Sequence, residues 1–143
     1  MIYEKREISS LEKKAKKTVS KSFLPEDIDV SILQTISYKY PKKIIDVQLS
    51  SQEFSSVCPY SDLPDFACLT IRYTPYKKLI ELKSLKYYIY AFHNVKIYNE
   101  HVVNKIMKDL KKILNPRKIE VTAEFSCRGG IINKVAATFK KKH

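Results

Sequence analysis

The spacing of apolar residues changes twice along the chain, and this change constrains the fold more than any other feature. Apolar and polar residues first alternate over two segments, then apolar residues recur every three or four positions over two segments, and alternation returns in the last two. Alternation is typical of a strand with one buried face, and the longer spacing is typical of an amphipathic helix. The pattern predicts the order strand, strand, helix, helix, strand, strand, which is an α+β unit. In chain order the segments are 42–49, 66–73, 81–92, 99–114, 118–125 and 131–139.

The second helix has the clearest signals. Asn99 is a suitable N-cap, and Pro116 is expected to end the helix after Leu114. One apolar stripe follows its length, formed by Val102, Val103, Ile106, Met107, Leu110, Ile113 and Leu114. In the second strand one face is apolar throughout, and it carries Ala67, Leu69, Ile71 and Tyr73. The elements fit a four-stranded antiparallel sheet with two helices on one face.

Such a sheet has two edge strands whose backbone groups need partners. Several subunits that join edge to edge into one barrel would supply those partners. Topology alone therefore favours a homo-oligomer built as a multi-subunit barrel.

A chain of 143 residues fits one domain with a core of ordinary size. Residues 1–22 are polar and basic, and we expect a weak helix or a mobile extension there, before a single catalytic domain at 23–143. No apolar run approaches the roughly 18 residues that cross a bilayer, and the N-terminus lacks the apolar segment of a secretory signal. We therefore expect a cytoplasmic protein without a membrane partner.

Basic residues are in large excess. Lysine and arginine number 27 against 15 acidic residues, so the formal net charge is +12. The lysines form local runs near the start, in the second helix and at the end of the chain. Two interpretations stay open: a solvated lysine-rich surface, or contact with a polyanion such as RNA.

The cysteines and histidines follow no ligand pattern. An odd number of cysteines at unrelated spacings argues against a disulfide framework, and no CxxC pair indicates a zinc site. The histidines are too scattered to form a ligand set by spacing alone. We therefore expect free thiols and no metal. The residues are Cys58, Cys68, Cys127, His93, His101 and His143.

One cysteine stands in a distinctive stretch, SSVCPYSDLPDFA. Cys58 is followed at once by Pro59, and Asp65 comes seven positions later in a predicted loop over 58–65. Cys58 is either a small buried residue or a nucleophile with Asp65 as its proton carrier. The second interpretation needs a thiol pKa below about 8.5, which nearby lysines would help to provide.

Four stretches carry a resemblance to a known family: QEFSSVCPYSDLPDF, ELKSLKYY, FHN and NEHVVN. Together they resemble the 7-cyano-7-deazaguanine (preQ0) reductases of queuosine biosynthesis, over roughly residues 44–133. These are tunnelling-fold enzymes related to GTP cyclohydrolase I. The resemblance implies the ββααββ tunnelling fold, a homo-oligomeric barrel, and active sites between subunits.

The resemblance also implies a reaction. Cys58 would attack the nitrile carbon of the deazapurine and form a covalent thioimide, and Asp65 would deliver a proton to the nitrogen. NADPH would then supply two hydrides, which take the nitrile to the primary amine preQ1. Glu100 would hold the purine-like edge, since a carboxylate accepts two parallel hydrogen bonds. From the residues alone, Glu100 is equally an acidic residue near a helix N-terminus.

The octapeptide ELKSLKYY matches the family's nicotinamide-cofactor signature. From the residues alone it is also the start of an amphipathic helix, and Arg128-Gly129-Gly130 is a hairpin turn. The resemblance implies that substrate binding uses Glu100, Ser84 and Asn99. It implies that NADPH binding uses Glu81, Lys83, Ser84, Lys86 and Arg128.

The chain departs from the family in two places. Bacterial members usually have Gly-Gln where this chain has Asp62-Leu63, and a histidine where it has Asn99. His101 and His93 are the candidates to replace that histidine. A sister family, the archaeosine synthases, keeps the cysteine and aspartate but adds ammonia to preQ0 already in tRNA, without NADPH.

That sister family lacks the octapeptide that is intact here, so the resemblance favours the reductase. Archaeosine synthesis, with tRNA as a partner, is the alternative. A non-catalytic basic RNA-binding tunnelling-fold protein is a second alternative.

Overall fold

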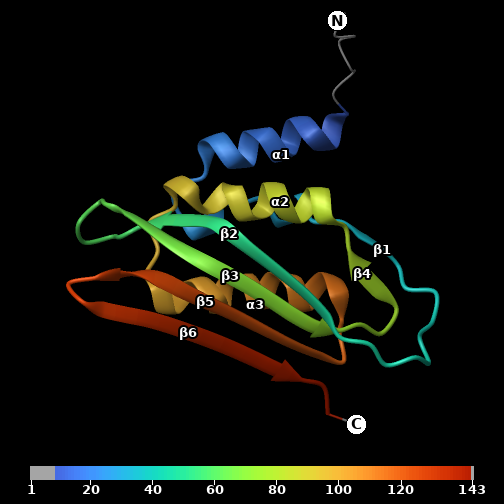
Figure 1. Cartoon of the computed structure of the whole chain (residues 1–143). Helices are drawn as coiled ribbons and strands as arrows, with labels where there is room; N and C mark the ends of the chain where they lie inside the picture. The colour runs from blue at the N-terminus through green and yellow to red at the C-terminus, as the bar shows by residue number, and fades with distance from the viewer. Residues whose placement is uncertain (1–8, 143) are drawn as a thin grey trace, which may run out of the picture.

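The computed structural model describes residues 9–142, and its centre is a four-stranded antiparallel sheet in the order β2-β3-β5-β6 (Figure 1). Two helices, α2 and α3, cover one face of this sheet. The predicted order strand, strand, helix, helix, strand, strand is confirmed. The elements are β2 (Val47–Val57), β3 (Pro64–Thr74), α2 (Leu82–Tyr90), α3 (Asn99–Leu114), β5 (Lys118–Arg128) and β6 (Ile131–Lys140).

The apolar face predicted for β3 is buried in the structure. Ala67, Leu69, Ile71 and Tyr73 are all buried. In the pairing register Leu69 lies opposite Ala123 of β5, and Ile71 lies opposite Val121, so two apolar faces join into one surface. Side chains that are two apart on a strand share a face, and the helices need one continuous apolar surface to pack on.

The first predicted strand is displaced. It was expected at 42–49, but β2 runs over Val47–Val57 and has a bulge between Ser51 and Phe54. Ile44 and Ile45 are exposed in the preceding loop, so their apolar character does not mark a buried face. Alternation predicts a strand only where a partner strand and a core are available to it.

The predicted N-cap of α3 is wrong. Asn99 is already the first helical residue, and Tyr98 occupies the cap position without a side-chain hydrogen bond. At the other end Asn115 adopts φ of 44° in the left-handed region, directly before Pro116, so the helix ends after Leu114 as expected. Most of the predicted apolar stripe of α3 is buried, while Met107 and Ile113 are half-buried.

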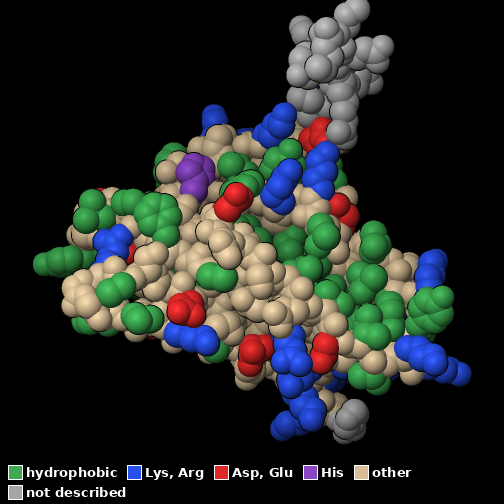
Figure 2. Space-filling model, in the orientation of Figure 1, with side chains coloured by type: hydrophobic (Ala, Val, Ile, Leu, Met, Phe, Trp, Pro, Cys, Tyr) green, Lys and Arg blue, Asp and Glu red, His purple; other side chains and the backbone are tan. Residues whose placement is uncertain are grey.

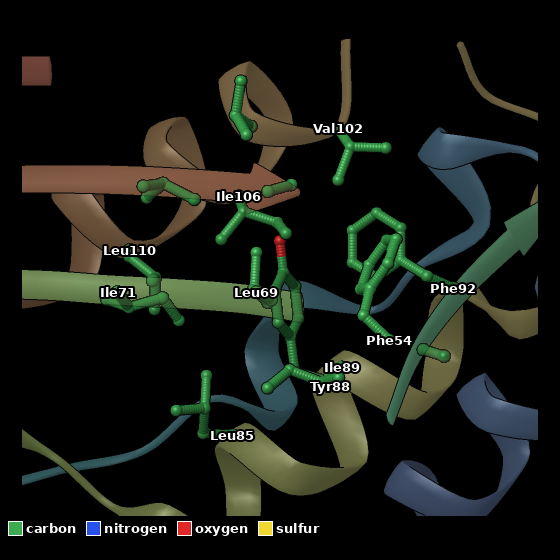
Figure 3. Packing of buried hydrophobic residues seen from close by; sticks show 14 of the residues in the cluster. Phe54, Leu69, Ile71, Leu85, Tyr88, Ile89, Phe92, Val102, Ile106 and Leu110 are labelled. Carbon is green, nitrogen blue, oxygen red and sulfur yellow. The ribbon is translucent and has the colours of Figure 1, made fainter. Parts of the chain in front are cut away.

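Aromatic side chains join the helices to the sheet (Figure 3). Phe54 of β2 lies 5.4 Å from Phe92, ring centroid to ring centroid, and Phe92 lies at the same distance from Tyr88 of α2. The Tyr88 hydroxyl donates to Asp109 of α3 at 2.6 Å, and Lys105 pairs with the same carboxylate at 2.8 Å. This network fixes α2 against α3 inside the core.

Two small elements lie at the margin, and only the short sheet was not predicted. A short sheet pairs β1 (Thr35–Ser37) with β4 (Lys78–Ile80), and a helix α1 (Ser10–Lys21) lies against α2. Ala15 and Thr18 of α1 are buried in that contact. Of the two expectations for the N-terminal segment, a helix is therefore found over the described part. Residues 1–8 lie outside the described residues, and the boundary between 22 and 23 stays a prediction.

Within residues 9–142, none of the helices combines the length and the hydropathy that a membrane crossing requires. Cys58, Cys68 and Cys127 are free thiols. The same part of the chain contains no group of three His, Cys, Asp or Glu side chains close enough to bind one metal ion.

Candidate active site

A tight turn between β2 and β3 holds Cys58. The Cys58 N–H donates to the Leu63 carbonyl at 2.9 Å, and the Asp62 N–H donates to the Cys58 carbonyl at the same distance. The turn is shorter than the predicted loop over 58–65, because Pro64 and Asp65 already belong to β3. Asp65 is therefore a strand residue, fixed by the sheet at the base of the turn.

The turn also activates the thiol. Hydrogen bonding by the Ser61 hydroxyl, and then by the backbone N–H groups of Ser61 and Tyr60, lowers the pKa of Cys58 below its ordinary value. Burial and the charge of Asp65 oppose this shift. Lysines were expected to play this part, but donors of the turn itself do so.

Asp65 is almost buried, with 9% of the residue exposed. It lies opposite Ser56 of β2 in the strand register. Its Oδ1 is 3.4 Å from a guanidinium nitrogen of Arg128, at the end of β5. The same guanidinium donates to the Pro64 carbonyl, so Arg128 ties the β5–β6 hairpin to the start of β3.

Main-chain hydrogen bonds join the Cys58 turn to the segment before α3. The Val57 N–H donates to the Val95 carbonyl at 2.9 Å, and the Ile97 N–H donates to the Val57 carbonyl at 3.1 Å. Lys96, between these two residues, pairs with the Asp62 carboxylate at 2.9 Å. The nucleophile turn and the first turn of α3 therefore occupy one end of the sheet.

Asn99 and Glu100 stand in that first turn of α3. Glu100 is exposed, and its Oε1 accepts a hydrogen bond from the Asn133 side chain of β6 at 3.3 Å. The His101 ring packs edge-on against Tyr98. His93 lies in the short 3₁₀ turn η3 (Ala91–Asn94), and both of its ring nitrogens are within hydrogen-bond distance of neighbours, the Tyr90 carbonyl and the Asn94 amide.

Exposed apolar side chains surround this end of the molecule, which is the left side of Figure 2. Each of them exposes half of its surface or more: Tyr60, Leu63, Phe66, Tyr98, Ile131 and Ile132. Because exposed apolar side chains that gather in one place mark interaction surfaces, this rim indicates a contact surface around Cys58.

The octapeptide lies at the opposite end of the sheet, where α2 begins beside β4 (Figure 1). Glu81 caps α2, since its carboxylate accepts from the N–H groups of Lys83 at 2.8 Å and Ser84 at 2.7 Å. Burial works against the ionised carboxylate, but these donors hold the pKa of Glu81 below its ordinary value. The buried Ser84 hydroxyl donates to the Glu81 carbonyl and accepts from the Gln34 N–H.

The two lysines of the octapeptide face different surfaces. Lys83 pairs with Glu12 of α1. Lys86 is exposed on the wall of a groove of about 330 Å³ between α2 and the edge strand β2. The groove floor is apolar and includes Leu69, Ile71, Leu85 and Ile89.

The predicted site residues therefore form two groups within one chain. The first group, at the Cys58 end, consists of Cys58, Asp65, Asn99, Glu100 and Arg128. The second group, at the start of α2, consists of Glu81, Lys83, Ser84 and Lys86.

Sequence reasoning missed four residues of the first group's surroundings: Ser56, Ser61, Lys96 and Asn133. Ser61 is a hydroxyl three positions after a candidate nucleophile, and that proximity was a usable signal. Nothing in the local sequence indicates that Lys96 and Asn133 reach this end, because tertiary pairing brings them there.

A four-stranded antiparallel sheet with two helices on one face defines an α+β protein of the tunnelling type. A solved structure, the apo form of an archaeosine synthase QueF-Like, has this fold, with a TM-score of 0.60 at 20% identity over 70% of this chain and 96% of that chain. The family model described as QueF-like protein matches residues 64–143. The chain belongs to the QueF-like family.

Curated relatives carry one functional name, NADPH-dependent 7-cyano-7-deazaguanine reductase. The protein of Caldicellulosiruptor bescii is 53% identical over 116 residues, covering 81% of this chain and 88% of the relative. That of Caldanaerobacter subterraneus subsp. tengcongensis is 50% identical, covering 82% and 87%. That of Chlorobium chlorochromatii is 42% identical, covering 77% and 95%.

The structure accounts for one departure from the bacterial members. Asp62 adopts φ of 60°, in the left-handed region that glycine enters without strain and that aspartate tolerates better than most residues. The backbone of the turn therefore suits the glycine of those members, and in this chain Asp62 adds the ion pair with Lys96.

Proposed function

We propose that this protein is an NADPH-dependent 7-cyano-7-deazaguanine reductase, which converts a nitrile to a primary amine. The observation that carries the proposal is a thiol of lowered pKa beside a nearly buried carboxylate at one end of the sheet. The name of the relatives at 50–53% identity supports it. The three free thiols fit a reducing cytoplasm.

Cys58 is the nucleophile. Its thiolate attacks the electrophilic nitrile carbon, a C–S bond forms, and one C–N π bond opens. Asp65 takes the proton that the Cys58 thiol loses and gives it to the nitrogen, which leaves a neutral thioimide on Cys58 and a carboxylate on Asp65. Arg128 stabilises that carboxylate. When bound, NADPH would supply two hydrides, which with one further proton take the thioimide to the amine while the C–S bond breaks and the Cys58 thiolate is regained.

Glu100 orients the substrate. Its carboxylate accepts hydrogen bonds from the N–H groups of the deazaguanine ring edge, and Asn133 holds one carboxylate oxygen in place. Asn99 stands beside it, where bacterial members have a histidine, and offers an amide that does not titrate.

The residues at the start of α2 fit the cofactor. Lys86 presents an exposed ammonium, 5.2 Å from the Tyr87 ring centroid, beside the groove along β2, which suits a phosphate. Lys83 adds a second positive charge near the helix start. Glu81 and Ser84 act through the helix cap that they build. Arg128 contributes its guanidinium at the Cys58 end.

The two groups of residues belong to one active site in an oligomer. The start of α2 in one subunit lies against the Cys58 end of another, so that NADPH held by the first reaches the substrate held by the second. The exposed apolar rim around Cys58 and the open edges of β2 and β6 support this arrangement.

The test is a reaction of the purified protein with free preQ0, followed by NADPH absorbance and mass spectrometry. The proposal expects two NADPH oxidised for each nitrile reduced. Inert NADPH, together with ammonia-dependent product on preQ0-containing tRNA, would replace the proposal with archaeosine synthesis. RNA binding without either reaction would indicate a non-catalytic RNA-binding protein.

A further inference from the structure

Ser56 carries a polar group that the fold leaves without a partner. The residue is 0% exposed, and its hydroxyl makes no hydrogen bond within residues 9–142. Buried hydroxyls are hydrogen-bonded in the great majority of cases, because an unpaired one destabilises the folded state. An alanine at this position would fill nearly the same space without that cost. The hydroxyl therefore needs an explanation other than packing.

The position of Ser56 supplies one. Ser56 lies directly opposite Asp65 in the β2–β3 register, and both side chains are on the buried face of the sheet with Phe54 and Ala67. Directly opposite side chains on one face have Cβ atoms about 4.5–5.5 Å apart. Rotation of the serine side chain about its Cα–Cβ bond redirects the hydroxyl without moving the backbone.

Asp65 is also short of partners. Its carboxylate accepts no hydrogen bond from residues 9–142, and its one ion pair, with Arg128, spans 3.4 Å. The main-chain groups of Val95 and Ile97 that face this part of β2 are already bonded to Val57. The Asp65 carboxylate, directly opposite Ser56 in the strand register, is therefore a neighbouring acceptor with capacity for the Ser56 hydroxyl.

We propose that Ser56 is a positioning residue for Asp65, and that its hydroxyl donates a hydrogen bond to the carboxylate as Asp65 gives up its proton. The inference rests on the proposed function. The proton moves from the Asp65 carboxyl to the nitrile nitrogen, and the negative charge stays on Asp65. A hydrogen bond to an ionised acceptor is stronger than one to a neutral acceptor. Ser56 therefore stabilises the transition state more than the complex in which Asp65 holds the proton, which raises kcat rather than substrate affinity.

The first experiment removes the hydroxyl alone. Ser56→Ala is expected to lower kcat about tenfold while the KM for preQ0 changes less than about twofold, since only the transition state loses a bond. Its thermal unfolding midpoint is expected to stay the same or rise, because an unpaired buried hydroxyl has gone. The matched control is Ser55→Ala, the half-buried neighbour opposite Phe66, which is expected to keep kcat.

A pair of larger substitutions separates the hydroxyl from any effect of size. Ser56→Thr and Ser56→Val add similar volume, and only Thr keeps the hydroxyl. Thr is expected to be at least about five times faster than Val, whatever strain the two share. Equal rates in the two variants would overturn the proposal.

An infrared spectrum tests the contact without relying on turnover. The band of the ionised Asp65 carboxylate is assigned by its absence in Asp65→Asn. The proposal expects this band to shift in Ser56→Ala and to stay unchanged in Ser55→Ala. A lower kcat in Ser56→Ala without a shift of the Asp65 band would overturn the proposal. The proposal would also be overturned if both kcat and the band stayed unchanged in this variant. If the wild type oxidises no NADPH with preQ0, the proposed function fails, while the infrared band still decides the contact.

Discussion

The two ends of the sheet treat their polar groups in opposite ways. At the start of α2 nearly every polar group is bonded within the chain: Glu81 caps the helix, Ser84 joins two main-chain groups, and Lys83 pairs with Glu12. At the Cys58 end the Ser56 hydroxyl has no hydrogen-bond partner within residues 9–142, and the Asp65 carboxylate has only the 3.4 Å ion pair with Arg128. Polar groups whose hydrogen bonds and ion pairs are all made within the chain hold the start of α2 rigid. Polar groups with unused hydrogen-bonding capacity are available to a substrate.

The strongest test of this contrast is the loss of the thiol. Cys58→Ala is expected to lower turnover by at least about a thousandfold and to abolish the covalent adduct with preQ0, because the proposed attack on the nitrile carbon uses this thiol alone. The adduct is measured by intact-protein mass spectrometry. Cys68→Ala and Cys127→Ala are the matched controls and are expected to keep the adduct. An adduct that persists in Cys58→Ala would show that the wrong end has been assigned to the chemistry.

Mixed oligomers test whether the two ends meet between subunits. Cys58→Ala protein is mixed, after dissociation and reassembly, with a Lys83→Ala, Lys86→Ala double variant, and activity is assayed at low NADPH. If the site takes one end from each subunit, random mixing restores about a quarter of the sites. Activity no higher than the sum of the separate variants would place the whole site within one chain. A monomer by light scattering would exclude the shared site altogether.

Lys86→Ala tests the cofactor end alone. Because Lys86 offers charge to a phosphate and little to a neutral heterocycle, the KM for NADPH is expected to rise about three- to tenfold while that for preQ0 stays the same. Lys108→Ala on the exposed face of α3 removes the same charge elsewhere and serves as the control. Equal effects of the two variants would mean that only net charge matters.

Ser61→Ala tests the activation of the thiol. The turn lowers the pKa of Cys58, so the reactive thiolate persists at a pH below that of an ordinary thiol. Loss of the Ser61 hydroxyl raises the pKa of Cys58, so the pH curve for alkylation of Cys58 by iodoacetamide moves to higher pH. The curve is measured by mass spectrometry of the Cys58 peptide. An unmoved curve would assign the activation to the backbone N–H groups alone.

Asp62 gives the smallest expected effect. Asp62→Gly loses an exposed ion pair with Lys96, worth about 0–1 kcal/mol, and relieves a left-handed residue, so the two changes nearly cancel. Asp62→Ala loses the same pair but keeps the unfavourable backbone, and it is expected to be about 1 kcal/mol less stable than Asp62→Gly. Chemical denaturation of both variants measures the difference. A glycine variant less stable than the alanine variant would contradict the backbone argument.

The sequence was most informative where one residue pattern determines one structure. The strict alternation of Ala67, Leu69, Ile71 and Tyr73 predicted the buried face of β3 correctly. The apolar stripe on α3 predicted the face on which the helix packs. It did not predict that Asp109 is buried, because its partners Lys105 and Tyr88 cannot be recognised from the stripe. Cys58 and Asp65 were singled out through their spacing and the family resemblance, and their catalytic roles stay a proposal.

The sequence was least informative where long-range pairing decides. Ile44 and Ile45 continue an alternating pattern but have no core to pack on, so β2 begins later than expected. Lys96 and Asn133 reach the Cys58 end only because β2 meets the segment before α3 and β6 returns beside Glu100. The octapeptide lies far from Cys58 because α2 begins at the opposite end of the sheet. The number of residues between the two motifs does not predict this distance.

The two bonds that join Val57 to Val95 and Ile97 have a consequence for how this protein can diverge. Both run between main-chain atoms, so every amino acid except proline can provide the N–H groups at positions 57 and 97. Side chains around Cys58 can therefore be exchanged over evolutionary time while its backbone keeps its place beside the segment that precedes α3. Asp62 and Asn99, where bacterial members usually have glycine and histidine, are substitutions of the kind that such an anchor permits.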